Sequence, residues 1–173
     1  FEDVQWEADD RSSFHIGVGF ADLSGFTRLS QQLPLADLSR ILTAFEEAAT
    51  DAVQDRGGRV VKFMGDAVMW VATSPHANAE IARAHVMHPL AAEANIPVRA
   101  GIAYGLVLAQ DGDYFGSTVN LASRLVALAE PGQVLSDAGL AAVLDDRWLA
   151  VPQEPVLVRG FDELVTPYLL TPG

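Results

Sequence analysis

The sequence predicts an α+β domain with a ferredoxin-like βαββαβ core, a mostly antiparallel sheet, helices packed on one face and extra C-terminal strands. Three observations support this fold class. A run with β-type alternation comes first, an apolar stripe with helical spacing follows, and the period then returns to 2 residues. The resulting order of elements is that of the split βαβ unit. With 173 residues, of which 50% are hydrophobic, the chain can bury one core.

The first strand is predicted at residues 15–21, and it runs into a polar loop that contains Gly25. A long helix follows, because apolar residues between Leu38 and Val53 recur at i, i+3, i+4 and i+7. Two β-rich runs, 60–63 and 68–71, then flank a Met-Gly-Asp-Ala segment. We interpret this segment as a hairpin with Asp66 at its tip.

The second half of the chain begins with an alanine-rich stretch, 77–94, which favours a helix that Pro89 should kink or end. Two strands joined at Tyr104-Gly105 are expected next, followed by a loop and a helix. The expected ranges from there on are strands at 98–103 and 106–109, a loop at 110–117, a helix at 118–129, a strand near Val134, a helix at 136–144, and strands near Trp148, at 155–158 and at 168–170.

Composition excludes several classes of protein. The chain has 11 Lys plus Arg against 23 Asp plus Glu, a net charge of −12, and this opposes general nucleic-acid binding. The absence of cysteine excludes disulfides, thiolate zinc sites and cysteine nucleophiles. Its apolar runs are too short for a membrane helix, and no secretory signal is visible, so a cytoplasmic location is expected. We expect residues 1–14 to be a lead-in or linker and residues 15–173 to be the folded domain of a longer protein.

Two aspartates should meet at one end of the sheet. Asp22 follows the first strand and Asp66 occupies the hairpin tip, so the split βαβ order brings both to the same end. Two carboxylates there would repel unless a cation joins them, and oxygen-only ligands suit Mg²⁺ or Mn²⁺. The alternative is that each Asp only forms a turn, as Asp commonly does.

Other polar residues have a functional and an ordinary interpretation. Lys62 lies in a strand with buried neighbours, where it either extends its ammonium to solvent or binds a ligand. Asn120 and Arg124 are spaced i, i+4 and share one face of a predicted helix, and Asp113 lies in the loop before it. Such a face could bind a nucleotide or simply be solvated. Arg99 and Arg159 lie in predicted strands and could be edge charges. His85 and His88 form no metal-ligand pattern and are expected at the surface.

Three blocks of sequence resemble the class III nucleotidyl cyclase catalytic domain. They are residues 20–27 (FADLSGFT), residues 61–66 (VKFMGD) and residues 113–124 (DYFGSTVNLASR). The resemblance extends from about residue 16 to residue 170, and the blocks stand in the family's order. It implies that residues 15–173 are a catalytic domain, and that the domain works as a homodimer whose active sites take residues from both copies.

The resemblance also assigns roles to individual residues. Asp22, Asp66 and the backbone carbonyl of Leu23 match the ligands of two divalent cations, Mg²⁺ or Mn²⁺. Lys62 and Asp113 match the pair that reads the adenine edge, where an ammonium donates to ring nitrogen N1 and a carboxylate accepts from the exocyclic amine. Guanylate cyclases that resemble this family carry Glu at the position of Lys62. The implied substrate is therefore ATP.

The remaining matches concern the ribose and the phosphates. Asn120 matches the residue that orients the ribose, and Arg124 matches the one that stabilises charge on the α-phosphate. Arg99 and Arg159 match positions that contact the β- and γ-phosphates, although the family often has lysine at the latter. The implied enzyme is an adenylate cyclase that forms 3′,5′-cyclic AMP and pyrophosphate by two-metal phosphoryl transfer.

One departure and two alternatives accompany this interpretation. Many family members have a longer hairpin arm before Asp113, whereas only residues 110–112 remain here, as in short-arm actinobacterial cyclases. A shorter arm leaves less interface, so dimerisation could depend on a regulatory domain elsewhere in the parent protein. The alternative function is a nucleotide-binding regulatory module of cyclase fold without turnover. A polymerase-like or diguanylate cyclase palm is disfavoured by the charge and by the absence of a Gly-Gly-acidic-acidic-Phe hairpin.

Overall fold

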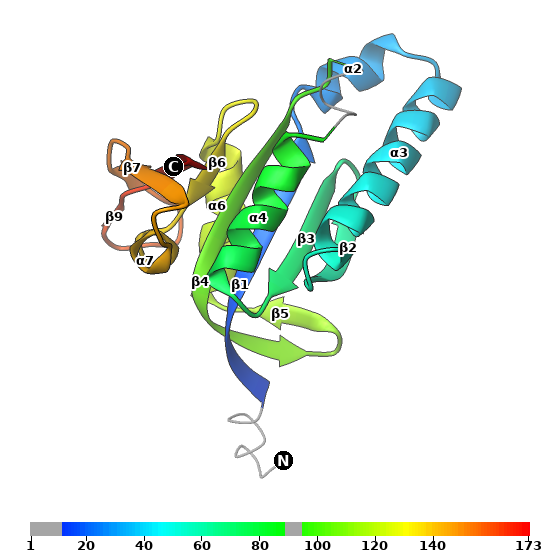
Figure 1. Ribbon diagram of the computed structural model, residues 1–173. Coiled ribbons are helices and arrows are strands. Elements are labelled where there is room, and N and C mark those ends of the chain that lie inside the picture. Colours follow the sequence, from blue (N-terminus) through cyan, green and yellow to red (C-terminus); the bar gives the residue numbers. More distant parts are fainter. Residues whose placement is uncertain (1–11, 89–94) are drawn as a thin grey trace.

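The computed structural model describes residues 12–88 and 95–173, and a twisted sheet runs through the middle of this part of the chain (Figure 1). Its strand order is β2-β3-β1-β4-β6-β10-β7, and β5 pairs with β4 outside this path. The strands are β1 Ser13–Leu23, β2 Arg59–Met64, β3 Ala67–Ala72, β4 Val98–Gln110, β5 Asp113–Phe115, β6 Val134–Ser136, β7 Trp148–Pro152, β8 Val156–Leu157, β9 Leu164–Val165 and β10 Tyr168–Pro172. The helices are α2 Phe26–Gln32, α3 Leu35–Gln54, α4 Pro75–Val86, α6 Ser117–Leu128 and α7 Ala138–Val143.

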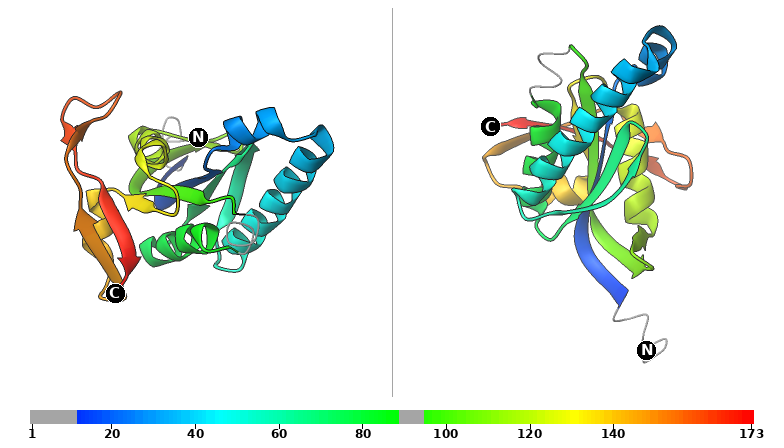
Figure 2. Two further views of the ribbon diagram at one scale, coloured as in Figure 1. Left: turned by 90° about the horizontal axis from the view of Figure 1, so that it is seen from above. Right: turned by 90° about the vertical axis from the view of Figure 1, so that its right-hand side faces the viewer.

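The predicted α+β fold class is confirmed. In chain order, β1, α3, β2, β3, α4 and β4 form the βαββαβ core, and their strands pair antiparallel in the order β2-β3-β1-β4. The pairing of β4 with β6 is parallel. The two core helices, α3 and α4, lie on one face of the sheet, whereas α6 covers the opposite face (Figure 2). The prediction that helices pack on one face holds for α3 and α4 of the core, whereas α6, which follows the core motif in the chain, packs on the other face.

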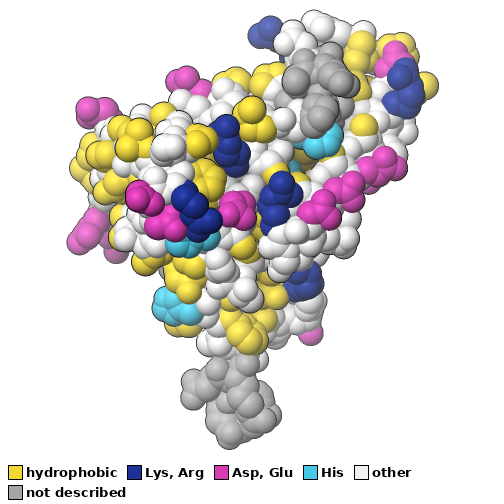
Figure 3. Space-filling model, in the orientation of Figure 1, with side chains coloured by type: hydrophobic (Ala, Val, Ile, Leu, Met, Phe, Trp, Pro, Cys, Tyr) yellow, Lys and Arg dark blue, Asp and Glu magenta, His cyan; other side chains and the backbone are white. Residues whose placement is uncertain are grey.

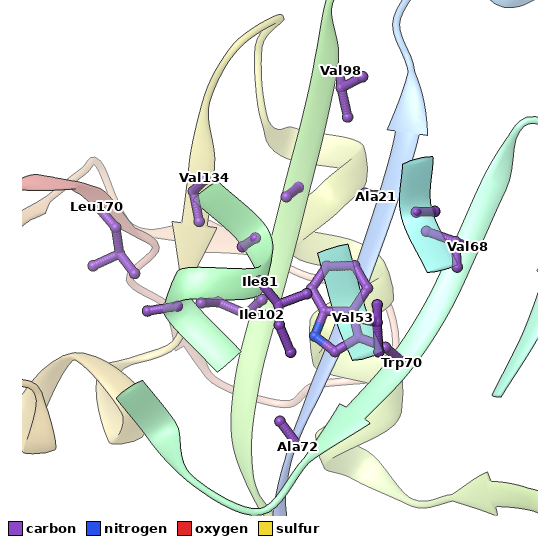
Figure 4. Packing of buried hydrophobic residues seen from close by; sticks show 14 of the residues in the cluster. Ala21, Val53, Val68, Trp70, Ala72, Ile81, Val98, Ile102, Val134 and Leu170 are labelled. Carbon is purple, nitrogen blue, oxygen red and sulfur yellow. The ribbon is translucent and has the colours of Figure 1, made fainter. Parts of the chain in front are cut away.

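Alternation along β1 explains the two faces. Val18 and Phe20 pack toward α6, while Ala21 and Leu23 pack toward α3 and α4. Figure 4 shows Trp70 among the apolar side chains of the α3/α4 face. Gly19 allows this packing, because a Cβ atom there would lie 2.1 Å from Cζ2 of Trp70.

A buried polar network contradicts the expectation that His85 lies at the surface. His85 is only 4% exposed and stacks on Trp70, with ring centroids 4.7 Å apart. Its Nδ1 lies 2.8 Å from the carbonyl oxygen of Ile81, and the Trp70 indole donates to Asn78. Burial, the largest cause, lowers the pKa of His85 to about 4, so the ring is neutral at physiological pH.

Three expected elements differ from the structure. β4 is continuous through Tyr104-Gly105, where two strands were predicted. Gly105 serves close packing there, since a Cβ atom would lie 2.6 Å from Oγ1 of Thr118 on α6. The expected loop at 110–117 contains β5, which pairs with β4 through a tight turn. α4 ends at Val86, and the rest of the predicted helix, 89–94 with Pro89, lies outside the described residues.

The surface on the α3/α4 side is uneven in charge. Figure 3 shows a row of acidic side chains along α3, where Glu46, Glu47 and Asp51 are exposed and line an open groove. This part of the negative charge therefore faces away from α6. None of the helices in residues 12–88 and 95–173 is both long and apolar enough to cross a bilayer.

Candidate active site

The first cluster of polar residues lies where β1 ends. Sheet register places Asp22 beside Ala67 of β3 and beside Arg99 of β4. Asp66 occupies the β2–β3 turn after Gly65, whose φ of 65° suits glycine. The backbone N–H of Leu23 donates to the carbonyl oxygen of Asp66 at 3.2 Å. The structure thus brings both carboxylates to the same end of the sheet.

Arg99 ties this cluster to α6. Its Nε donates to Oδ1 of Asp22 at 2.8 Å, and its Nη1 donates to the carbonyl oxygens of Ala127 and Ala129 at 3.1 and 3.3 Å. Both partners of the ion pair are largely shielded, with side chains 30% and 19% exposed. Arg99 therefore holds the Asp22 carboxylate and the end of α6 together.

The charge state of Asp66 reflects its surroundings. Burial raises the pKa of the Asp66 carboxyl, and the negative charge of Asp22 raises it further, while a backbone hydrogen bond and Arg99 act in the opposite direction. A nearby cation would stabilise the ionised form of a carboxyl group that is partly desolvated and lies close to another carboxylate. The site therefore favours a bound positive charge.

The oxygen atoms of this cluster suit a hard divalent cation. A cavity of about 240 Å³ lies between β1 and α6, and Asp22, Arg99 and Ser123 are among the residues that line it. The described residues contain no group of three or more His, Cys, Asp or Glu side chains that could hold a metal. Mg²⁺ accepts one or two carboxylates when backbone oxygens, water or substrate phosphates complete its shell. Two aspartates with the adjacent Leu23 backbone fit that requirement.

The second cluster pairs residues 51 positions apart in the chain. Nζ of Lys62 on β2 lies 2.8 Å from Oδ2 of Asp113 on β5. Oδ1 of Asp113 also accepts from the backbone N–H of Tyr114 at 2.8 Å. These two contacts hold the pKa of the Asp113 carboxyl below its usual range, with the Lys62 bond as the larger cause. Asp113 therefore remains ionised and oriented at neutral pH.

A β-bulge aims Lys62 at this partner. Val60 pairs with Trp70, but the register then shifts so that Lys62 pairs with Met69. Trp70 belongs to the α3/α4 face and Met69 to the α6 face. Regular pairing would have placed Lys62 opposite Val68, on the α3/α4 side. The extra residue therefore turns the lysine toward the face where Asp113 lies.

Asn120 and Arg124 lie on the outward side of α6. The buried residues of this helix are Ala122, Leu125 and Val126. Asn120 and Arg124 stand two positions before and after Ala122, and each lies about 160° around the helix from it. Across residues 12–88 and 95–173, neither side chain makes a hydrogen bond or an ion pair. Within one chain they therefore do not join either cluster.

Arg159 lies apart from both clusters. It was expected in a strand, but β8 ends at Leu157 and Arg159 occupies the exposed turn that leads toward β9. β8 and β9 form a separate two-stranded sheet. In the described part of the chain Arg159 has no ion pair with Asp22 or Asp66. One chain alone does not bring this arginine to the carboxylates.

Sequence reasoning missed a second bridge between β2 and β5. Nη2 of Arg59 donates to the hydroxyl of Tyr114 at 2.7 Å, beside the Lys62–Asp113 pair. The hairpin that carries Tyr114 had a visible signal, because Asp-Gly is typical of tight β-turns. Asp111 and Gly112 have φ values of 55° and 77°, as such a turn requires.

Comparison with known proteins identifies the family. Residues 9–172 match the family described as the adenylate and guanylate cyclase catalytic domain. An uncharacterized protein of Mycobacterium tuberculosis is 52% identical over 162 residues, which cover 94% of this chain and 43% of that protein. A protein named adenylate cyclase from Glutamicibacter nicotianae is 41% identical over 159 residues, covering 90% of this chain and 39% of the relative. The chain thus spans about two fifths of the length of these curated relatives.

Solved structures share the fold. The adenylyl cyclase CyaB from P. aeruginosa superposes with a TM-score of 0.85 at 24% identity, covering 93% of this chain and 95% of that one. The catalytic core of a rhodopsin-guanylyl cyclase superposes with a TM-score of 0.84 at 21% identity, covering 92% and 97%. With the match across residues 9–172, these findings show that the chain belongs to the class III nucleotidyl cyclase catalytic domains.

Proposed function

We propose that this domain is an adenylate cyclase, which converts ATP to 3′,5′-cyclic AMP and pyrophosphate in a homodimer. The observation that carries the proposal is the pairing of Lys62 with Asp113 at 2.8 Å, in a sheet that also brings Asp22 and Asp66 to one end. The catalytic unit is residues 15–173, with 1–14 as a lead-in. Relatives named adenylate cyclase support this activity.

Lys62 and Asp113 select the base. The Lys62 ammonium donates to N1 of adenine, and the Asp113 carboxylate accepts from the exocyclic amine. Guanine presents a donor at N1 and an acceptor at the neighbouring carbonyl. Its N1 donor would therefore face the Lys62 ammonium, which is also a donor, and its carbonyl would face the Asp113 carboxylate, which is also an acceptor. A buried polar group left unpaired costs about 1 to 3 kcal/mol, which is enough to prefer ATP strongly.

A second copy completes the site. Asn120 and Arg124 point away from the sheet of their own chain, so they are free to act on a nucleotide held between two subunits. Each site then combines the carboxylates and Arg99 of one subunit with the base-reading pair, Asn120 and Arg124 of the other. A twofold dimer would contain two such sites, because each subunit supplies its carboxylates to one site and its Asn120 and Arg124 to the other.

Metal ions and arginine side chains bind the phosphates. Asp22, Asp66 and the Leu23 carbonyl would hold two divalent cations, Mg²⁺ or Mn²⁺, which when bound lower the pKa of a coordinated hydroxyl and neutralise phosphate charge. Arg99 lies beside Asp22 and can reach a triphosphate at this end of the sheet. Arg124 stabilises charge that develops on the α-phosphate, and Arg159 is the proposed contact to the terminal phosphates.

The reaction is an intramolecular displacement. The ribose 3′-oxygen forms a bond to the α-phosphorus as the bond from that phosphorus to the bridging oxygen breaks. Pyrophosphate carries away the electron pair, and the 3′-hydroxyl proton passes to water or to a substrate phosphate. Asn120 orients the ribose so that attack occurs in line. The acidic row on α3 lies on the other face of the sheet and does not oppose the triphosphate at close range.

A direct test is to incubate the purified domain with Mn²⁺ and either ATP or GTP, and to separate the products by chromatography. The proposal predicts cyclic AMP from ATP, with much less cyclic GMP from GTP. The alternative, a nucleotide-binding regulatory module, predicts binding of ATP without product over a range of protein concentrations at which dimers are present.

We further propose that the parent protein carries a regulatory domain, since the matched relatives are more than twice as long as the matched region.

A further inference from the structure

The strand that carries Asp113 has few backbone constraints. β5 contains three residues, 113–115, and pairs with β4 through a turn of two residues. β4 and β2 are separated by β1 and β3 in the sheet. In the described part of the chain no backbone pairing joins β5 to β2. The distance between Asp113 and Lys62 therefore depends on side-chain contacts.

Two side-chain bridges supply those contacts. The first is the Lys62–Asp113 ion pair, whose side chains are 44% and 29% exposed. A nucleotide would have to insert its base edge into this pair and replace their mutual bond. The second bridge joins Arg59 to Tyr114, with a hydrogen bond of 2.7 Å and the guanidinium carbon 5.3 Å from the ring centre. The second bridge does not involve the atoms that would read the base.

Packing alone leaves Tyr114 room to move. Its ring is half-buried and, like Ile16 and Val61, packs against the buried cluster on the α6 face. A cavity of about 290 Å³ adjoins it, lined also by Phe14, Ile16 and Arg59. Since the ring is not enclosed on that side, the hydroxyl bond to Arg59 limits how far β5 can move away from β2.

We propose that Arg59 and Tyr114 are positioning residues, whose hydrogen bond holds β5 against β2 and keeps Asp113 in register with Lys62 when a nucleotide separates that pair. Neither residue touches the substrate. The inference rests on the proposed role of Lys62 and Asp113 in base selection. Loss of the bridge should leave the phosphate end of the site intact and weaken discrimination between adenine and guanine.

The test compares Tyr114→Phe and Arg59→Ala with two controls. Tyr168→Phe removes the same hydroxyl from β10, and Arg40→Ala removes an exposed arginine that pairs with Asp37 on α3. For each protein, kcat and KM are measured with ATP and GTP, and binding is measured with analogues in which a methylene group replaces the α,β-bridging oxygen. Thermal unfolding shows whether each variant is folded.

We expect the ATP-to-GTP ratio of kcat/KM to fall about five- to tenfold in Tyr114→Phe and Arg59→Ala, mainly through KM for ATP. The double variant should show little further loss, because both changes remove the same bridge. The controls should keep the wild-type ratio. An active wild type whose two bridge variants keep that ratio within twofold would overturn the positioning role alone. A wild type without turnover would overturn the cyclase proposal, and the analogue-binding ratio would still decide the role of the bridge.

Discussion

Reversing the charge of Lys62 is the sharpest perturbation of the proposed base-reading pair. In Lys62→Glu, two carboxylates would face each other where Nζ and Oδ2 now lie 2.8 Å apart. Because both side chains are partly exposed, the ion pair contributes little to folding, on the order of 0 to 1 kcal/mol. The variant should therefore fold, with a small decrease in the free energy of unfolding.

The effect on nucleotide selection should be much larger. Adenine N1 would lose its donor and meet an acceptor, and one mispaired polar group costs about 1 to 3 kcal/mol, equivalent to roughly 5- to 150-fold in kcat/KM for ATP. Guanine N1 carries a hydrogen that a glutamate can accept, so activity with GTP should rise. The ATP-to-GTP ratio should consequently fall by at least the ATP factor.

Steady-state assays with Mn²⁺ and each nucleotide measure this ratio. Arg40→Glu is the matched control, because it makes the same charge change at an exposed position of α3, where Arg40 pairs with Asp37 of the same helix. Lys62→Met separates loss of the donor from gain of an acceptor. If Lys62→Glu folds and keeps the wild-type ratio, Lys62 does not read the base.

Two further predictions concern metal binding and pH. Asp22→Ala and Asp66→Ala should each reduce metal-dependent turnover below about a tenth of wild type while the domain stays folded, as circular dichroism can verify; a higher residual rate would contradict the metal assignment. His85 has a pKa of about 4 in the folded chain against 6.5 unfolded, so the unfolded chain binds the extra proton between these values. The contribution of this residue to stability is complete above pH 6.5 and decreases by up to about 3 kcal/mol as the pH falls to 4. Urea unfolding at pH 7 and pH 4.5 should show a larger loss in wild type than in His85→Phe, because other shifted groups, such as Asp137 with its pKa raised to about 6, titrate in both proteins. An equal change in both would refute the assignment.

Local sequence patterns were sufficient for the core of the fold. Periodicity located β1, α3 and the β2–β3 hairpin, and the split βαβ order predicted that Asp22 and Asp66 lie at one end of the sheet. These features depend on residues close in the chain or on a common strand order. The predictions about them needed no knowledge of side-chain packing.

Features set by tertiary packing could not be predicted in the same way. The Val-Val-Lys-Phe sequence contains no signal for the β-bulge before Lys62. This bulge nevertheless decides on which face of the sheet the lysine lies. Gly105 suggested a turn, but its small size serves the close approach of α6. His85 looked like a surface residue because Trp70, on which its ring stacks, becomes a neighbour only when α4 packs on the sheet.

The central claim is that each active site combines residues of two chains. It is tested most directly by mixing Asp22→Ala and Arg124→Ala chains, each inactive alone, under conditions in which subunits exchange and heterodimers are verified by differential tagging. With random pairing about half of the dimers are mixed and each has one intact site of two, so activity per chain should recover to about a quarter of wild type. Verified heterodimers without cyclic AMP formation would contradict the shared site.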